Sequence, residues 1–417
     1  MRPSSRLTEI TLLTRNGVEP MTQKTNLSCP GFKFSGIPAG IKKTNLKDLG
    51  LIYSQRVATI SGLFTKNVVK AAPVVLDKKR IQSGKARAVI VNSGNANCCT
   101  GDRGMADAHT MTRSLANALQ IDENHVYVAS TGVIGQYLNI SAIETALPDL
   151  INQLSENNLQ DLAEAIMTTD TIPKMAGKSV QIRDKKFHIC ATAKGAGMIR
   201  PDMATLLNFV CTDIQADQQI LHECFKTAVN QSMNLITIDG DTSTNDTALI
   251  LANGMSGLSL DETDIRECFQ QTLNSIMLDL AKALVKDGEG VNKLVEIRVK
   301  GAHSVEDAQK ISDTVAHSNL VKTAIFGEDA NWGRILAACG RAGVDFNPLE
   351  LSIQFNDTTI FDNGVYSGEQ AEENVSLVLQ EDEYVITIDL KKGDHCHSMY
   401  TCDFSYDYVR INADYRT

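Results

Sequence analysis

The stretch "KGAGMIRPDMATLLNFVCTD", residues 194–213, places two glycines and a proline directly before an apolar run at 206–212. The run predicts a buried strand, and Thr205 stands at the junction between the two parts. A threonine hydroxyl is a weak nucleophile that needs a base. Its own α-amino group, with a pKa of about 8, would supply that base once the preceding peptide bond was cut. Thr205 is therefore either a candidate nucleophile or an ordinary β-branched residue of a strand.

Helical and strand patterns alternate along the rest of the chain, which indicates an α/β fold. Its 417 residues are enough for two lobes. Apolar residues recur at helical spacing in 104–120, 217–233 and 261–286. Strand patterns occupy 87–92, 126–130, 180–192, 206–212, 247–252, 294–300, 320–326, 351–355, 384–390 and 399–411. We expect 180–192 to form a hairpin that turns at 184–186. A strand-rich sub-lobe is expected from about residue 345, with 290–300 as another candidate boundary.

The composition limits the classes of function. A net charge of −10 argues against a general binder of nucleic acid or of anionic membranes. No apolar run reaches the roughly 18 residues of a membrane span, and residues 1–20 make a poor signal peptide. We expect those twenty residues to be an N-terminal extension of unknown role. The ten cysteines form no CxxC pair and lie mostly in apolar segments, which favours buried thiols in a reducing cytoplasm.

Three familiar motifs are incomplete. Residues 177–179, "GKS", resemble the end of a phosphate-binding loop, but Ile172 occupies the position of its first glycine. "GAGMIR" lacks the last glycine of a dinucleotide fingerprint, because Arg200 stands there. His395 and His397 share one face of a predicted strand, but no third ligand is spaced nearby. A solvated strand end is favoured over a metal site, and we expect no bound metal.

Five short segments combine glycine with Asn, Thr and Asp beside apolar strands, where α/β proteins place their chemistry. They are 91–101, 129–135, 167–174, 239–247 and 286–293. Each could be a tight turn, but ordinary turns do not need so many polar side chains. In the second segment, Thr131 and Gly132 can offer backbone N–H groups and a hydroxyl to an oxyanion.

Seven motifs together resemble the ornithine acetyltransferases of arginine biosynthesis, also called bifunctional glutamate N-acetyltransferase/amino-acid acetyltransferase. They are "AKGAGMIRPDMATLL", "NSGNAN", "STGVIG", "TTDTIPK", "DGDTSTNDT", "GEDANWGR" and the terminal "NADYRT". The resemblance runs from about Met21 to Thr417. Departures from the usual family pattern are Cys98 in place of alanine and Ala330 in place of proline, and both are conservative in size. Trp332 lies in one of the motifs, and we expect it to be a packing anchor.

The resemblance implies autocatalytic cleavage between Ala204 and Thr205. The products would be an α chain, 21–204, and a β chain, 205–417, whose first residue is the nucleophile. The implied fold is a layered strand–helix architecture similar to that of N-terminal-nucleophile aminopeptidases of the DmpA type. The implied assembly is an α2β2 heterotetramer, and cytoplasmic localisation is expected.

The resemblance also implies ping-pong acyl transfer. Thr205 would take the acetyl group of N-acetyl-ornithine, with Thr131 and Gly132 holding the oxyanion. Ornithine would leave, and glutamate would take the acetyl group to give N-acetyl-glutamate. The implied substrate-binding residues are Thr168, Lys194, Thr205, Glu289, Asn412 and Thr417. No bound cofactor is implied, although acetyl-CoA is a possible co-substrate.

The charges of two of these residues suit an amino-acid substrate. Lys194 can pair with a carboxylate and Glu289 with an ammonium group. Two alternatives remain open from the sequence. An N-terminal-nucleophile aminopeptidase or amidase would share the cut but pass the acyl group to water. A non-enzymatic amino-acid-binding protein would not be cut at all.

Overall fold

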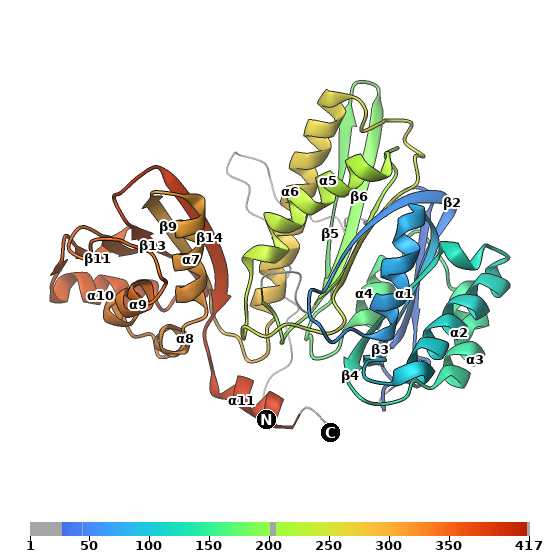
Figure 1. Cartoon of the computed structure of the whole chain (residues 1–417), viewed down its shortest axis with the longest axis horizontal. Coiled ribbons are helices and arrows are strands. Elements are labelled where there is room, and N and C mark those ends of the chain that lie inside the picture. Colours follow the sequence, from blue (N-terminus) through green and yellow to red (C-terminus); the bar gives the residue numbers. More distant parts are fainter. Residues whose placement is uncertain (1–26, 44, 201–205, 415–417) are drawn as a thin grey trace, which may run out of the picture.

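The computed structural model describes residues 27–43, 45–200 and 206–414. These residues form two lobes, each built on its own sheet (Figure 1). The mixed α/β class and the layered strand–helix architecture predicted from the sequence are confirmed. Among the described residues, no helix combines the length and the apolar character that crossing a membrane requires.

The first lobe holds an eight-stranded sheet in the order β4-β3-β2-β8-β7-β6-β5, with β1 paired to β2. Its strands are β1 (Phe32–Ile37), β2 (Leu49–Phe64), β3 (Lys85–Asn95), β4 (Val126–Val133), β5 (Lys174–Ile182), β6 (Lys185–Lys194), β7 (Leu207–Thr212) and β8 (Thr247–Ala252). The pairs β3–β4 and β7–β8 are parallel. All six residues of β7 are buried, as expected of a strand covered on both faces.

Helices cover both faces of this sheet. They are α1 (Ala72–Arg80), α2 (Gly101–Leu119), α3 (Ile140–Asn152), α4 (Leu159–Ile166), α5 (Gln218–Asn230) and α6 (Thr263–Lys286). On one face, α5 and α6 pack on β6–β8, while α2 and α3 pack on β2–β4. Helix α4 packs on the opposite face. The three helices expected at 104–120, 217–233 and 261–286 correspond to α2, α5 and α6 and are confirmed, whereas α1, α3 and α4 were not predicted.

The second lobe holds a six-stranded sheet in the order β12-β11-β10-β13-β9-β14. Its strands are β9 (Leu294–Ala302), β10 (Ser352–Phe355), β11 (Thr358–Asp362), β12 (Val365–Tyr366), β13 (Glu383–Asp389) and β14 (His395–Cys402). Helices α7 (Val305–Ala316), α8 (Asn319–Phe326), α9 (Trp332–Gly340) and α10 (Glu369–Val378) accompany it. The strands after residue 345 thus share their sheet with β9, which lies between β13 and β14. Trp332 stacks on Phe361 with ring centroids 4.8 Å apart, which confirms its packing role.

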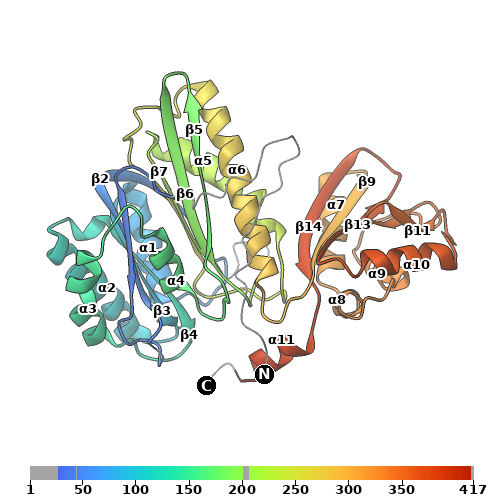
Figure 2. The same cartoon turned by 180° about the vertical axis from the view of Figure 1, so that it is seen from behind.

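The last element, α11 (Tyr406–Ala413), leaves the second lobe and runs toward the first (Figures 1 and 2). The Ser405 side chain caps its start by accepting from Tyr408 N–H. Two contacts tie α11 to loops of the first lobe: Tyr408 Oη donates to Asp239, and Asn412 donates to Glu289. The C-terminal segment is therefore positioned to contribute to a site in the first lobe.

Two sequence predictions are wrong. The stretch 320–326 is helix α8, not a strand, because Val321, Ala324 and Ile325 bury one helical face and Ser318 caps the start. The stretch 399–411 is not one strand, because the Ser405 cap begins α11 after β14 has ended. The predicted hairpin is confirmed as β5–β6, but its first strand begins at Lys174 rather than at 180. Its turn lies at Arg183 and Asp184 rather than at 184–186, because Lys185 already pairs with Ile182.

The rejected motifs also have a structural outcome. The "GKS" residues 177–179 lie inside β5, so they form no phosphate-binding loop. His397 Nδ1 lies 2.8 Å from Ser312 Oγ, and the described part of the chain holds no cluster of His, Cys, Asp and Glu fit to bind a metal ion. All ten cysteines are free, and seven of them are buried, as expected.

Candidate functional site

A cavity of about 250 Å³ lies in the first lobe, where loops from both halves of its sheet meet. It draws residues from four of the five polar segments predicted above and from α11. The lining residues are Thr131, Gly132, Val133, Ile134, Thr168, Thr169, Lys194, Ala196, Gly197, Met198, Ser243, Thr244, Asn245, Glu289 and Asn412. Six predicted site residues, namely Thr131, Gly132, Thr168, Lys194, Glu289 and Asn412, thus surround one cavity. Ala204, Thr205 and Thr417 lie outside the described residues.

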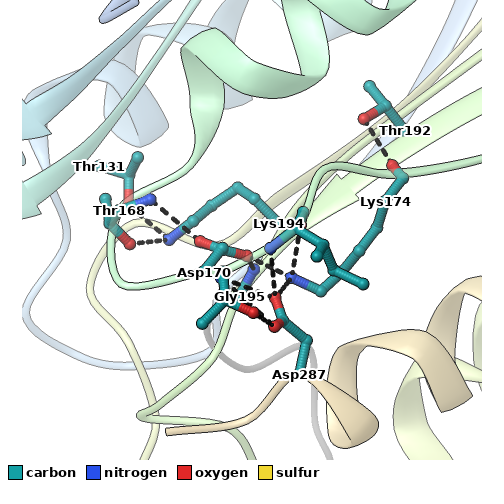
Figure 3. A network of polar contacts seen from close by, with 10 residues as sticks. Thr131, Thr168, Asp170, Lys174, Thr192, Lys194, Gly195 and Asp287 are labelled. Carbon is teal, nitrogen blue, oxygen red and sulfur yellow. Dashed lines mark hydrogen bonds and ion pairs between the residues drawn. The ribbon is translucent and has the colours of Figure 1, made fainter. Parts of the chain in front are cut away.

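Lys194 ends β6 and is only 4% exposed. Its ammonium group points at two hydroxyls, donating to Thr168 Oγ1 at 2.9 Å and to Thr131 Oγ1 at 3.2 Å (Figure 3). Burial lowers the pKa of Lys194, and the negative charge of Asp170 opposes that effect. The cavity therefore presents a buried cationic side chain held by neutral hydroxyls, which leaves its charge available to an anionic ligand group.

Asp170 stands behind Lys194 with a side chain that is fully buried. Its carboxylate accepts from Lys174 Nζ at 2.7 Å, from Gly195 N–H at 2.8 Å and from Thr168 N–H at 3.0 Å. Burial alone would raise the pKa of Asp170, but the charges of Lys194 and Lys174 outweigh it and hold that pKa far below its usual range. Asp170 is therefore an ionised anchor for the two cavity-lining segments that contain Thr168 and Lys194.

Glu289 brings the opposite charge to the cavity. It is 6% exposed, and its backbone N–H donates to Ala196 O at 2.7 Å. The side-chain Oε2 accepts from Asn412 Nδ2 at 2.8 Å. A Cβ added at Gly197 would lie 2.5 Å from Glu289 Oε2, so a side chain at this position would displace the carboxylate. The cavity thus carries both signs of charge on buried side chains.

Thr131 and Gly132 lie at the end of β4, which extends to Val133, so they belong to a strand rather than to a loop. Gly132 has φ +133°, a conformation that favours glycine. A Cβ there would lie 2.3 Å from the Gly94 carbonyl carbon of β3. The segment 91–101 therefore does not line the cavity itself but packs directly behind it.

The loop 239–247 connects the two halves of the site. Asn245 Nδ2 donates to Ala96 O at 2.6 Å and to Ser130 O at 2.7 Å. Asp246 Oδ1 accepts from Leu206 N–H at 2.8 Å, and Leu207 is the strand partner of Lys194. Leu206 and the start of β7 therefore lie beside the Lys194 end of β6.

Comparison with known proteins identifies the family. The ArgJ family profile matches residues 33–417. The chain belongs to the ArgJ family. This membership confirms the resemblance that the sequence motifs carried.

The match with this chain spans nearly the whole length of each similar protein. The arginine biosynthesis bifunctional protein ArgJ of Desulfotalea psychrophila is 48% identical over 389 residues, which span 93% of this chain and 99% of the relative. The protein of the same name from Geobacter sulfurreducens is 48% identical over 394 residues, or 94% and 100% of the two chains. A solved Mycobacterium tuberculosis ornithine acetyltransferase complexed with ornithine is 32% identical, with a TM-score of 0.37, and covers 44% of this chain and 97% of that one.

Three residues of this ArgJ-family site were not singled out from the sequence: Asp170, Lys174 and Asp287. Each lies inside a polar segment that was recognised, "TTDTIPK" or "KDGEGVNK". The available signal was the charge of Lys174, which is opposite to that of Asp170, four residues before it, and of Asp287, 113 residues after it. Sequence spacing gives no reason to pair Lys174 with Asp287, because that pairing depends on how α6 ends against β5.

Proposed function

We propose that this chain is an autoprocessed acetyltransferase of arginine biosynthesis that moves an acetyl group from N-acetyl-ornithine to glutamate. The observation that carries the proposal is the joint presence of Lys194 and Glu289, both buried, in one small cavity. An α-amino-acid substrate with a second amine needs one cationic and one anionic partner. The curated relatives, named as bifunctional proteins of arginine biosynthesis, support the same assignment.

The proposed reaction has two half-reactions. The Thr205 Oγ attacks the acetyl carbonyl of N-acetyl-ornithine while the free α-amine of Thr205 takes the hydroxyl proton. The C–N bond then breaks, the proton passes to the departing nitrogen, and ornithine leaves. The amine of glutamate attacks the resulting acetyl-threonine ester, and the threonine hydroxyl is restored. Thr131 and Gly132 would stabilise the oxyanion of each tetrahedral intermediate.

The remaining roles follow from charge and position. Lys194, with Thr168 beside it, would bind a substrate carboxylate, and Glu289, oriented by Asn412, would bind the side-chain ammonium of ornithine. Thr417 would complete the substrate-binding set. Before either half-reaction, self-cleavage between Ala204 and Thr205 would free the catalytic amine and divide the polypeptide into a chain that ends at Ala204 and a chain that begins at Thr205. We further propose an α2β2 assembly of these chains in the cytoplasm.

A donor assay tests the function. Purified protein incubated with N-acetyl-ornithine and glutamate should release ornithine and N-acetyl-glutamate in equal amounts, measured by liquid chromatography and mass spectrometry. With glutamate omitted, ornithine release should fall sharply, because water is a poor acceptor. Ornithine release that does not depend on glutamate would instead identify an amidase. A parallel reaction with acetyl-CoA as donor decides whether the chain also acts as an amino-acid acetyltransferase.

Glu289→Gln tests the ammonium partner. Loss of one buried charge-assisted contact of about 1.5–3 kcal/mol should lower kcat/KM for N-acetyl-ornithine by roughly 10- to 150-fold. We expect most of the loss in KM, measured from initial rates. Glu328→Gln is the matched control, because Glu328 pairs with Lys293 outside the cavity and is 44% exposed. Equal effects of the two substitutions would contradict the role given to Glu289.

A further inference from the structure

Lys174 is a buried cation that the proposed reaction does not use. Its side chain is 1% exposed, and its ammonium lies 2.7 Å from Asp170 Oδ1 and 2.5 Å from Asp287 Oδ2. Figure 3 shows it between the two carboxylates, on the far side of Asp170 from the Lys194 ammonium. Desolvating three charges is costly, and removal of any one of them leaves a buried charge without compensation.

One carboxylate that Lys174 contacts bonds the segment of Lys194, and the other lies two residues before Glu289. Asp170 accepts from the N–H of Gly195, the residue next to Lys194. Asp287 bonds the residue that follows Asp170: it accepts from Thr171 N–H at 3.0 Å and also from the Thr171 hydroxyl. Asp287 precedes Glu289 by two residues, at the end of α6. The Lys174 ammonium is thus a buried ionic link between the segment that contains Lys194 and the segment that contains Glu289. It acts beside two other links, the Thr171–Asp287 hydrogen bonds and the bond from Glu289 N–H to Ala196 O.

The backbone of Lys174 is fixed as well. Lys174 is the strand partner of Ala193, and its carbonyl accepts from Thr192 Oγ1 at 2.8 Å. The ammonium is therefore held from a rigid strand pair, β5–β6, rather than from a mobile loop. A side chain locked in this way can set the position of its partners to within a fraction of an ångström.

We propose that Lys174 is a positioning residue that fixes the spacing between Lys194 and Glu289 and thereby selects the chain length of the amino-acid donor. This inference rests on the proposed function. Under the proposed cleavage, Lys174 and Asp170 belong to one chain and Asp287 to the other, so the ion pair spans the cut. The spacing of the two substrate-binding charges is then set by interchain contacts, among them the Lys174–Asp287 pair, and not by a continuous backbone.

The chain length of the donor is the property to measure. A site that fixes two charges at one spacing should discriminate against homologues of N-acetyl-ornithine with one methylene fewer or more, by roughly 10- to 200-fold in kcat/KM. The homologues are the corresponding N-acetyl derivatives of 2,4-diaminobutyrate and lysine. Lys174→Gln and Asp287→Asn each remove one charge with little change of shape. Both variants should reduce the ratio of kcat/KM for N-acetyl-ornithine to kcat/KM for each homologue by at least about tenfold, mainly through KM.

Lys178→Gln is the matched control. Lys178 lies on the same strand, four residues further along, and is exposed. It should keep the wild-type preference. A general loss of structure lowers kcat/KM for N-acetyl-ornithine and for both homologues by the same factor. A change in the ratio of these kcat/KM values therefore distinguishes a positioning role from a role in stability.

The outcomes separate the two proposals. A wild-type protein that transfers acetyl from none of the donors overturns the proposed function. An active wild type with variants that retain the full preference overturns the positioning role of Lys174. If neither variant folds, as judged by circular dichroism and gel filtration, the network serves stability alone and the positioning role is also overturned.

Discussion

Thr205→Ala is expected to leave a single polypeptide of the full 45.4 kDa on a denaturing gel and to remove acetyl transfer. The wild type should give two fragments whose masses sum to that value, with one beginning at Thr205. Alanine has no hydroxyl to attack the preceding carbonyl, so neither the cut nor the later acetyl ester can form. Loss of a nucleophile typically costs at least about 10⁴-fold in rate. Intact-mass spectrometry and the donor assay measure the two effects.

Two further variants sharpen this result. Thr205→Ser keeps a hydroxyl and should retain measurable cleavage. A Thr205→Ser protein that is not cut and still transfers acetyl groups at the wild-type rate would contradict the role given to Thr205. Thr212→Ala changes a buried threonine at the other end of β7 and should leave the cut unaffected. An uncut wild type that still transfers acetyl groups would contradict the proposed processing.

Asp170→Asn should destabilise the first lobe by about 3–5 kcal/mol, because it leaves buried cationic charge without its compensating partner. The side chains of Asp170 and Lys174 are both essentially inaccessible to water, so solvent cannot substitute for the lost charge. The comparison is urea unfolding followed by far-ultraviolet circular dichroism. Trp332 lies in the second lobe, so its fluorescence should report a smaller change than the dichroism does.

The pH dependence of this effect has a defined sign. Because the folded-state pKa of Asp170 is lowered by Lys194 and Lys174 against the effect of burial, its carboxylate contributes stability that is fully present above its unfolded pKa of about 3.9. That contribution is lost as the pH falls through the range below this value. The stability gap between wild type and Asp170→Asn should thus be constant near neutrality and narrow in acid.

Asp161→Asn provides the control for the same measurement. Asp161 forms an ion pair with Lys47 in the same lobe, but its side chain is 32% exposed. Exposed pairs contribute about 0–1 kcal/mol, so this substitution should barely move the transition. Similar shifts for the two variants would show that Asp170 is not the buried anchor inferred above.

Part of the fold could be read from periodicity. The strands β7, β8 and β13 and the helices α2, α5 and α6 have long, regular apolar patterns, and all were predicted. The segment of α8, "LVKTAIF", is short and apolar, and such a run fits the period of a strand as well as that of a helix. Its cap at Ser318 and the burial of one face decided the helix.

The residues of the candidate site could likewise be predicted only in part from the sequence. The resemblance to a known family implied Thr168, Lys194 and Glu289, and the glycine-bearing segment 129–135 predicted Thr131 and Gly132. The structure brings these residues to one cavity. Asn412 reaches the cavity because α11 returns from the second lobe, which no local pattern indicates.

The sequence by itself determined which reactive groups this protein has: a threonine after a glycine-bearing approach, a lysine and a glutamate of opposite charge, and family motifs within residues 33–417. These are local properties, carried by residue type and short spacing. The tertiary structure decided which charges compensate one another. Lys174 pairs with Asp170 only four residues before it, but it meets Asp287 because β5 begins where α6 ends. Ion pairing in a buried site depends on distances of a few ångströms, which residues 113 positions apart in the sequence acquire only by folding.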